Sequence, residues 1–292
     1  MTTALSNAQI ARYHEDGFVK PIRALSTQQA ATIRAEIEAL ERDHADGAGG
    51  HTLGQFFRVN GQVTIPLLAQ IARTPAVLDA VESILGPDLL VWSCELFIKE
   101  AGSEKIVSWH QDLTYWGMGE TDDEITAWIA ISDVSERAGC MRFVPGSHKL
   151  RIQPHNDSFD ADNLLSRGQE VAVEVDEADA VPDTLEPGEM SLHHGRLFHA
   201  SGPNRSGDRR IGMAIRYVTP AVEQTIAARD YAMLVRGADH SCNWINIAPP
   251  AGLFAPASLA LYDRILNDQA AALTAGAAQA VGLYDGEHKA PV

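Results

Sequence analysis

The sequence predicts a mainly β protein with flanking α-helices, whose core is a double-stranded β-helix of the jelly-roll, cupin-like kind. Between residues 89 and 218, short apolar runs alternate with turn residues, and there are about eight such runs, the strand number of a jelly roll. Helical periodicity is confined to the first third of the chain and to a stretch near its C-terminus. The predicted strands cover residues 89–99, 106–110, 125–133, 141–144, 170–175, 189–193, 197–200 and 210–218.

The 292 residues are expected to form a single domain, because β barrels with added helices often reach this length as one unit. We divide this domain into three parts by the change of pattern along the chain. A helical N-terminal scaffold is expected at about residues 1–88, a jelly-roll core at about 89–220 and a C-terminal extension with a helix at about 221–292.

Three helices and one short strand are expected in the N-terminal scaffold. A serine cap, or a threonine followed by proline, marks each helix start, and a stretch that contains glycine ends each one. The predicted helices cover residues 6–16, 26–46 and 74–85, and a strand or edge segment covers residues 17–19. Residues 51–62 show no decisive period and are expected to be irregular.

Two further segments lie outside the regular β pattern. The polar insertion at residues 149–167 is too long for a plain hairpin, so it is a candidate lid or rim of a site. The alanine- and leucine-rich residues 257–275 predict a helix that serves packing or the contact between two copies in a homodimer.

Composition excludes several classes of function. The net charge of −16 opposes nucleic acid and anionic membranes as partners, and argues mildly against coenzyme A esters as substrates. Cys94, Cys140 and Cys242 are widely spaced and odd in number, which argues against a disulfide framework or a thiolate zinc site. No run of about twenty apolar residues and no basic or apolar N-terminal segment is present. We therefore expect a cytoplasmic protein that acts on a small molecule.

The chemistry-bearing motif is His110-x-Asp112, read together with His199. On an extended segment, side chains two residues apart point to the same face, so His110 and Asp112 form a half-site for a metal. One distant imidazole completes a set of two nitrogens and one carboxylate, the set that non-haem ferrous iron uses when positions must stay open. Alone, the motif is weak, because His-x-Asp often arises by chance.

A predicted hairpin connects His199 to an arginine. The dense turn signal at residues 201–208 separates His199 from a strand that begins at Arg210. Alternation puts Arg210, Gly212 and Ala214 on one face, which combines a guanidinium with two very small residues. Such a face makes room for a co-substrate with a carboxylate and can clamp it through two hydrogen bonds.

Four motifs together resemble the phytanoyl-CoA dioxygenase family of iron(II)/2-oxoglutarate oxygenases. The similarity runs from about residue 15 to residue 218 and is specific as a set. The motifs are His110-Gln111-Asp112, Ala138-Gly139-Cys140-Met141 leading into Pro145-Gly146-Ser147-His148, Pro187-Gly188-Glu189, and His199-x-Ser201-Gly202-x-Asn204 ending in Arg210.

The resemblance implies a 2-oxoglutarate-dependent hydroxylase that uses Fe(II), 2-oxoglutarate and O2 and releases succinate and CO2. It implies iron ligation by His110, Asp112 and His199, and 2-oxoglutarate contacts from Arg210, Ser201, Trp128 and Gln111. Strand alternation agrees with this for Trp128, but it points Gln111 away from the metal. Halogenating relatives lack the carboxylate that Asp112 supplies, so hydroxylation or a related oxidation is expected.

The substrate candidates are weaker. Tyr115 and Trp116 follow the metal motif closely and are candidates to line a substrate pocket. Arg167, in the insertion, is a candidate to bind an anionic group or to form a surface salt bridge, and Arg236 is a further candidate. Two other classes of protein stay open at this point: a cupin-like, non-redox isomerase or hydrolase with zinc or manganese, and a non-catalytic jelly-roll binding module.

Overall fold

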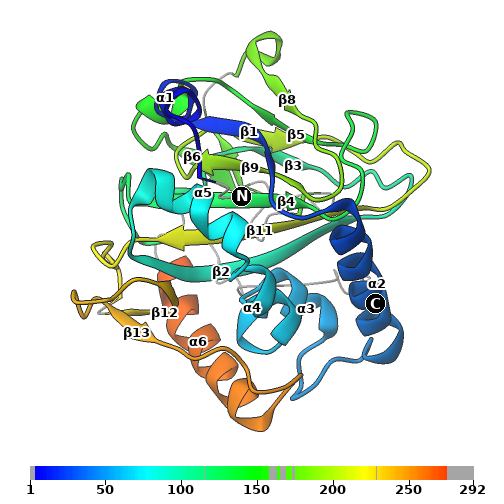
Figure 1. Cartoon of the computed structure of the whole chain (residues 1–292), viewed down its shortest axis with the longest axis vertical. Helices are drawn as coiled ribbons and strands as arrows, with labels where there is room; N and C mark the ends of the chain where they lie inside the picture. The colour runs from blue at the N-terminus through cyan, green and yellow to red at the C-terminus, as the bar shows by residue number, and fades with distance from the viewer. Residues whose placement is uncertain are drawn as a thin grey trace.

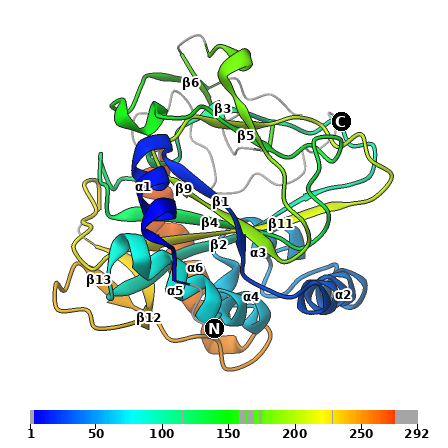
Figure 2. The same ribbon diagram turned by 45° about the horizontal axis from the view of Figure 1, so that its top comes forward.

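The computed structural model describes residues 4–114, 116–157, 163–164, 169–172, 175–227 and 229–274. The fold is mainly β, with two facing sheets and helices packed on the outside (Figures 1 and 2). Tyr115 and Arg167 lie outside the described residues. None of the helices in the described ranges is both long and apolar enough to span a membrane.

The larger sheet has seven strands, and all neighbouring pairs in it are antiparallel except the parallel pair β12–β13. Alternation along these strands gives the sheet an apolar outer face and an inner face that carries polar side chains. In spatial order the strands are β1 (Phe18–Arg23), β9 (Glu189–His194), β4 (Glu124–Ala130), β11 (Arg210–Val218), β2 (Leu89–Lys99), β12 (Asp230–Arg236) and β13 (Trp244–Asn246).

The smaller sheet has four strands and lies over the inner face of the larger one (Figure 2). Its strands, in spatial order, are β3 (Val107–His110), β10 (His199–Ser201), β5 (Met141–Phe143) and β8 (Val181–Asp183). A separate two-stranded ribbon joins β6 (His155–Asp157) to β7 (Gln169–Val171), and β6 belongs to the predicted insertion.

The helices cover the outer face of the larger sheet and form the main apolar core with it (Figure 1). On β11 this core receives Ile211, Met213, Ile215 and Tyr217, so the alternate residues of the same strand point into the space between the sheets. The helices are α1 (Asn7–Asp16), α2 (Thr27–Asp43), α3 (Leu53–Arg58), α4 (Pro66–Ile71), α5 (Pro75–Leu85) and α6 (Pro256–Thr274).

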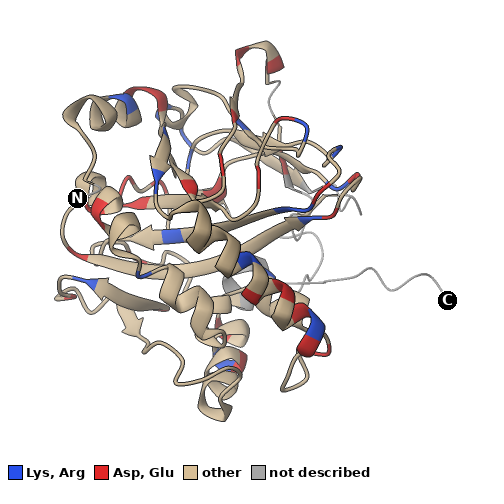
Figure 3. Ribbon diagram, turned by 45° about the vertical axis from the view of Figure 1, so that its right-hand side comes forward, with Lys and Arg blue, Asp and Glu red and all other residues tan. Residues whose placement is uncertain are grey.

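Charged residues of both signs lie along α2 (Figure 3). Acidic residues of α2 connect this helix to the larger sheet, because they pair with Arg209, which precedes β11. Its Nη2 donates to Glu41 Oε1 at 2.7 Å, and its Nε donates to Glu100 Oε2 at 2.9 Å. Arg209 therefore serves the outer surface, while Arg210 points inward.

Most predicted elements are confirmed. The predicted bounds of β2 and β11 match the structure, and Ser6 and Ser26 cap α1 and α2 with capping boxes. The expectation that residues 51–62 are irregular is wrong, because α3 lies within them and is capped by Thr52. Six residues make less than two helical turns, so α3 shows no period that a sequence pattern can reveal.

Candidate active site

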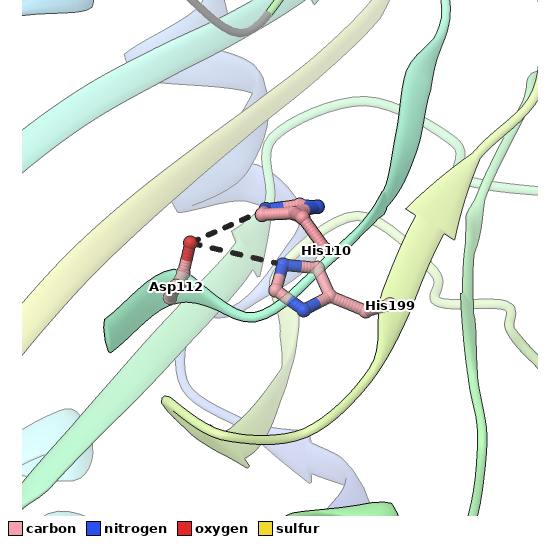
Figure 4. Close-up of side chains that lie close together, drawn as sticks. All are labelled: His110, Asp112 and His199. Atoms are coloured by element: carbon pink, nitrogen blue, oxygen red, sulfur yellow. Dashed lines mark ion pairs between the residues drawn. The ribbon is translucent and has the colours of Figure 1, made fainter. Parts of the chain in front are cut away.

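His110, Asp112 and His199 come together because β3 and β10 are antiparallel neighbours. The register places His199 opposite His110, and Asp112 begins the short 3-10 turn that follows β3. His110 Nε2 lies 3.3 Å from Asp112 Oδ1, and His199 Nε2 lies 4.0 Å from the same oxygen (Figure 4). All three candidate ligand atoms lie within 4.8 Å of one another, the one such cluster that the described residues contain.

Hydrogen bonds on the far side of each imidazole orient the rings. His110 Nδ1 lies 2.9 Å from the carbonyl of Ser108, and His199 Nδ1 lies 3.0 Å from the carbonyl of Leu197. A carbonyl only accepts, so each Nδ1 carries a proton, and Nε2 is the nitrogen that each ring turns toward the cluster. This is the arrangement that metal-binding histidines usually have.

The charge states also suit a metal. Burial, together with the charge of His110, holds the pKa of His199 well below its usual value, so its imidazole is neutral. Burial would raise the pKa of Asp112, but hydrogen bonds to His110 and His193 outweigh it and hold that pKa well below its usual range. The neutral imidazole of His199 and the ionised carboxylate of Asp112 are forms that bind metal ions.

A cavity of about 160 Å³ opens beside these three residues, between the two sheets. Its lining falls into two groups. Around His110, Asp112, His199 and Arg210 lie Val107, Thr126, Trp128, Met141, His193, Ala200 and Ser201. Around Arg216 lie Asn60, Trp92, Ser93, Glu95, Trp116, Gln224, Asp230 and Gln269.

Arg210 is a charged side chain of the first group whose hydrogen-bonding capacity is not fully used within the described residues. It is 1 % exposed, and its Nε and Nη2 make no hydrogen bond to any described residue. Burial lowers its pKa to about 10, and its guanidinium lies 5.3 Å from the ring centre of Trp128. A Cβ on Gly212 would lie 1.9 Å from that indole, so the missing side chain is what lets Trp128 occupy this wall.

Lys99 is a buried amine that the sequence reasoning missed. It stands opposite Arg210 in the β2–β11 register and is 0 % exposed. Its Nζ donates to Ser201 Oγ at 2.7 Å and to the carbonyl of Gly202 at 2.6 Å. Burial and the charge of Arg210 lower its pKa to about 6. Strand alternation with Phe97 was the available signal, because both residues belong to the inward face of β2.

Two site predictions need correction. Gln111 does not line the cavity: its Nε2 donates to the carbonyl of Arg196 at 2.8 Å, and its Oε1 accepts from the backbone of Gln153 at 2.8 Å. Gln111 directly follows β3, on the side away from the metal cluster, as alternation indicated. Arg236 also lies outside the cavity wall, because it pairs with Asp79 and Glu82 of α5.

The remaining candidates are Trp116, Tyr115 and Arg167. His193 of β9, which was not a candidate, lines the cavity at 1 % exposure, and its Nε2 lies 3.9 Å from Asp112 Oδ2. Trp116, a candidate to line a substrate pocket, lines the cavity. Tyr115 and Arg167 lie outside the described residues.

Two proteins of similar sequence are named as dioxygenases. A probable alpha-ketoglutarate-dependent hypophosphite dioxygenase of Stutzerimonas stutzeri is 26% identical over 90% of this chain and 96% of its own. An ectoine dioxygenase of Bordetella parapertussis is 28% identical over 51% of this chain and 51% of its own.

Solved structures extend the likeness. The non-heme monooxygenase ThoJ in its apo form superposes with a TM-score of 0.82 at 35% identity, covering 91% of this chain and 98% of ThoJ. CytC3 with Fe(II) and alpha-ketoglutarate has the same fold, with a TM-score of 0.65 at 23% identity over 87% of this chain and 98% of its own. The model of the phytanoyl-CoA dioxygenase (PhyH) family matches residues 13–212. The chain therefore belongs to the phytanoyl-CoA dioxygenase family of 2-oxoglutarate-dependent non-haem iron dioxygenases.

Proposed function

We propose that this dioxygenase hydroxylates a C–H bond of a small to medium-sized organic molecule, with release of succinate and CO2. The observation that carries the co-substrate assignment is Arg210. Its buried guanidinium has two nitrogens without a partner among the described residues, in the same cavity as the candidate metal cluster. A buried cation with open N–H groups requires an anion, and a carboxylate matches its planar geometry.

The side chains fit both Fe(II) and 2-oxoglutarate. Two Nε2 atoms and one carboxylate oxygen are the donor set of non-haem ferrous iron. In this proposal His110, Asp112 and His199 hold the metal, and Arg210 pairs with the distal carboxylate of 2-oxoglutarate. When bound, Fe(II) supplies the activation of dioxygen that is coupled to oxidative decarboxylation of 2-oxoglutarate.

The protein's own residues position the ligands and exclude water from the site. Lys99 orients the hydroxyl of Ser201 through a hydrogen bond, and Trp128 forms a wall beside Arg210. The apolar residues Val107, Met141 and Ala200 border the cavity near the cluster, so bound substrate displaces water from it. Asp112 fills the position that a halide would need, which favours hydroxylation over halogenation.

The relatives support a small substrate, since two of them are named for ectoine and proline. We propose that the two facing sheets form a double-stranded β-helix. In this proposal the whole chain is one oxygenase domain, with an N-terminal helical scaffold and a C-terminal extension that closes the cavity. Gln269 of α6 supports the latter role, because it lines the cavity.

The test has an anaerobic and an aerobic part. Without O2, adding Fe(II) and 2-oxoglutarate to the wild-type protein should produce a visible charge-transfer absorption, and Asp112→Ala should lose it. In air, Asp112→Ala should also lose substrate-dependent succinate formation. Correct folding of the variant is checked by its circular dichroism spectrum. A folded wild-type protein that shows no such absorption would instead favour a non-redox metal enzyme or a binding module.

A further inference from the structure

The second group of cavity residues is centred on another buried arginine of β11. Arg216 lies six residues beyond Arg210 on the same inward face, and it is 5 % exposed. Its Nη1 lies 2.7 Å from Glu95 Oε1, while its Nε has no hydrogen-bond partner among the described residues. The guanidinium also stacks over Trp116, 4.7 Å from the ring centre.

This ion pair lies next to the candidate metal cluster. Arg216 stands opposite Thr126 in the β11–β4 register, and Thr126 Oγ1 lies 3.4 Å from Asp112 Oδ2. Glu95 stands opposite Ala214, whose small side chain leaves space on the cavity floor. A molecule that rests on Ala214 therefore lies between the metal position and the Arg216–Glu95 pair.

A second carboxylate organises the wall around this pair. Asp230 Oδ2 accepts from Trp92 Nε1 at 2.7 Å and from Gln224 Nε2 at 3.0 Å. Asp230 Oδ1 accepts from Gln269 Nε2 at 2.9 Å. Gln224 lines the cavity, and its buried Oε1, which has no hydrogen-bond partner among the described residues, lies beside Gly117, where a Cβ would meet it at 2.3 Å.

The charged pair Arg216–Glu95 determines what kind of molecule fits. An apolar substrate would bury the guanidinium and the carboxylate in the cavity and give neither a new polar contact, which is unfavourable. A molecule with one anionic and one cationic group can pair with both side chains and adds no net charge to the site. Sites built to pair with polar groups reject analogues that lack them.

We propose that the substrate is a small amino-acid-like zwitterion, with its carboxylate held by Arg216 and its ammonium group held by Glu95. This inference rests on the proposed function. Glu95 lies within residues 13–212, which match the family, whereas Arg216 lies beyond them.

The experiment uses matched triplets of L-amino acids, their methyl esters, and the corresponding acids that lack the amino group. Binding is measured as the rise in Tm of the full-length protein with Fe(II) and 2-oxoglutarate under anaerobic conditions, and turnover as succinate formed in air. At least one zwitterion should bind and stimulate succinate formation, and its two partners should bind about 10- to 100-fold more weakly.

Variants test which side chain holds the carboxylate of the substrate and which holds its ammonium group. Arg216→Gln should weaken binding of the zwitterion by about 10- to 100-fold and leave the Fe(II)/2-oxoglutarate absorption in place. Glu95→Gln should weaken the zwitterion but not the acid without an amino group. The outward pair Arg209 and Glu100 provides matched controls, Arg209→Gln and Glu100→Gln. If Arg216→Gln does not fold, the double variant with Glu95→Gln removes both charges together.

Three results would overturn the inference: no zwitterion binds, an ester binds as tightly as its parent amino acid, or Arg216→Gln leaves affinity unchanged. Each is read in protein that shows the Fe(II)/2-oxoglutarate absorption. Absence of that absorption from the wild type would instead contradict the proposed function.

Discussion

Arg210 and Arg216 occupy the same face of one strand, and both are almost completely buried, but their surroundings differ. Arg210 has Lys99 as its register neighbour and open N–H groups, and burial lowers its pKa to about 10. For Arg216, burial also acts to lower the pKa, but the charges of Glu95 and Asp112 outweigh it and raise the pKa above its usual value.

The difference fits our proposal of two ligand sites in one cavity. Arg210 has two guanidinium nitrogens without a hydrogen-bond partner among the described residues, and we assign that end to the carboxylate of the co-substrate. Around Arg216 an acidic partner, Glu95, already balances the charge, and we assign that end to the substrate. The comparison predicts that changes at the two ends affect different ligands.

A large effect is expected from Gly212→Ala, which acts on the Arg210 end. The new Cβ would lie 1.9 Å from Trp128 Cζ2 and 2.2 Å from Cη2, so the rigid indole must move into the space beside Arg210. Such overpacking costs about 1–3 kcal/mol. We expect a lower Tm and 2-oxoglutarate affinity reduced about 10- to 100-fold in an anaerobic titration.

Gly207→Ala is the control for this change, because a Cβ there meets nothing within 4 Å on the turn that precedes β11. It should leave both the Tm and the affinity for 2-oxoglutarate close to those of the wild type. Equal affinity in both glycine variants would show that Trp128 does not form part of the co-substrate wall.

A smaller effect is expected from pH, again only at the Arg210 end. The pKa of Lys99 is lowered to about 6, so its amine loses its proton as pH rises above that value. A bound carboxylate would raise this pKa, so binding takes up a proton and 2-oxoglutarate affinity falls as pH rises above about 6, by at most about tenfold per pH unit. Lys99→Met should flatten this dependence, as measured by 2-oxoglutarate titrations between pH 6.5 and about 8.5. An unchanged slope in that variant would assign the proton to another group.

Much of the Arg210 end could be predicted from the sequence. The motif His110-x-Asp112 and the hairpin from His199 to Arg210 are local patterns, and strand alternation places Arg210, Gly212 and Ala214 on one face of β11. Gln111 shows the limit of motif matching, because alternation indicated its outward position more accurately than the family resemblance did.

The Arg216 end was not predicted, for a physical reason. Its contacts join residues far apart in the chain, such as Asp230 with Trp92 and Gln269 with Asn60. No short pattern encodes which of these polar residues meet. Arg216 belongs to the same alternating face as Arg210, so its inward direction was readable, but its pairing with Glu95 needed the register of β2 against β11. The short helix α3 was missed for a related reason, since its six residues show no period.

The most direct test of the two-ended cavity is one anaerobic 2-oxoglutarate titration, followed by the visible absorption of the Fe(II) complex, in Arg210→Gln and Arg216→Gln side by side. We predict that Arg210→Gln weakens 2-oxoglutarate by about 100-fold or more, because a charged pair with the carboxylate is lost, while Arg216→Gln stays within about threefold of wild type. Equal weakening in both variants, or loss only in Arg216→Gln, would contradict the assignment of the co-substrate to Arg210.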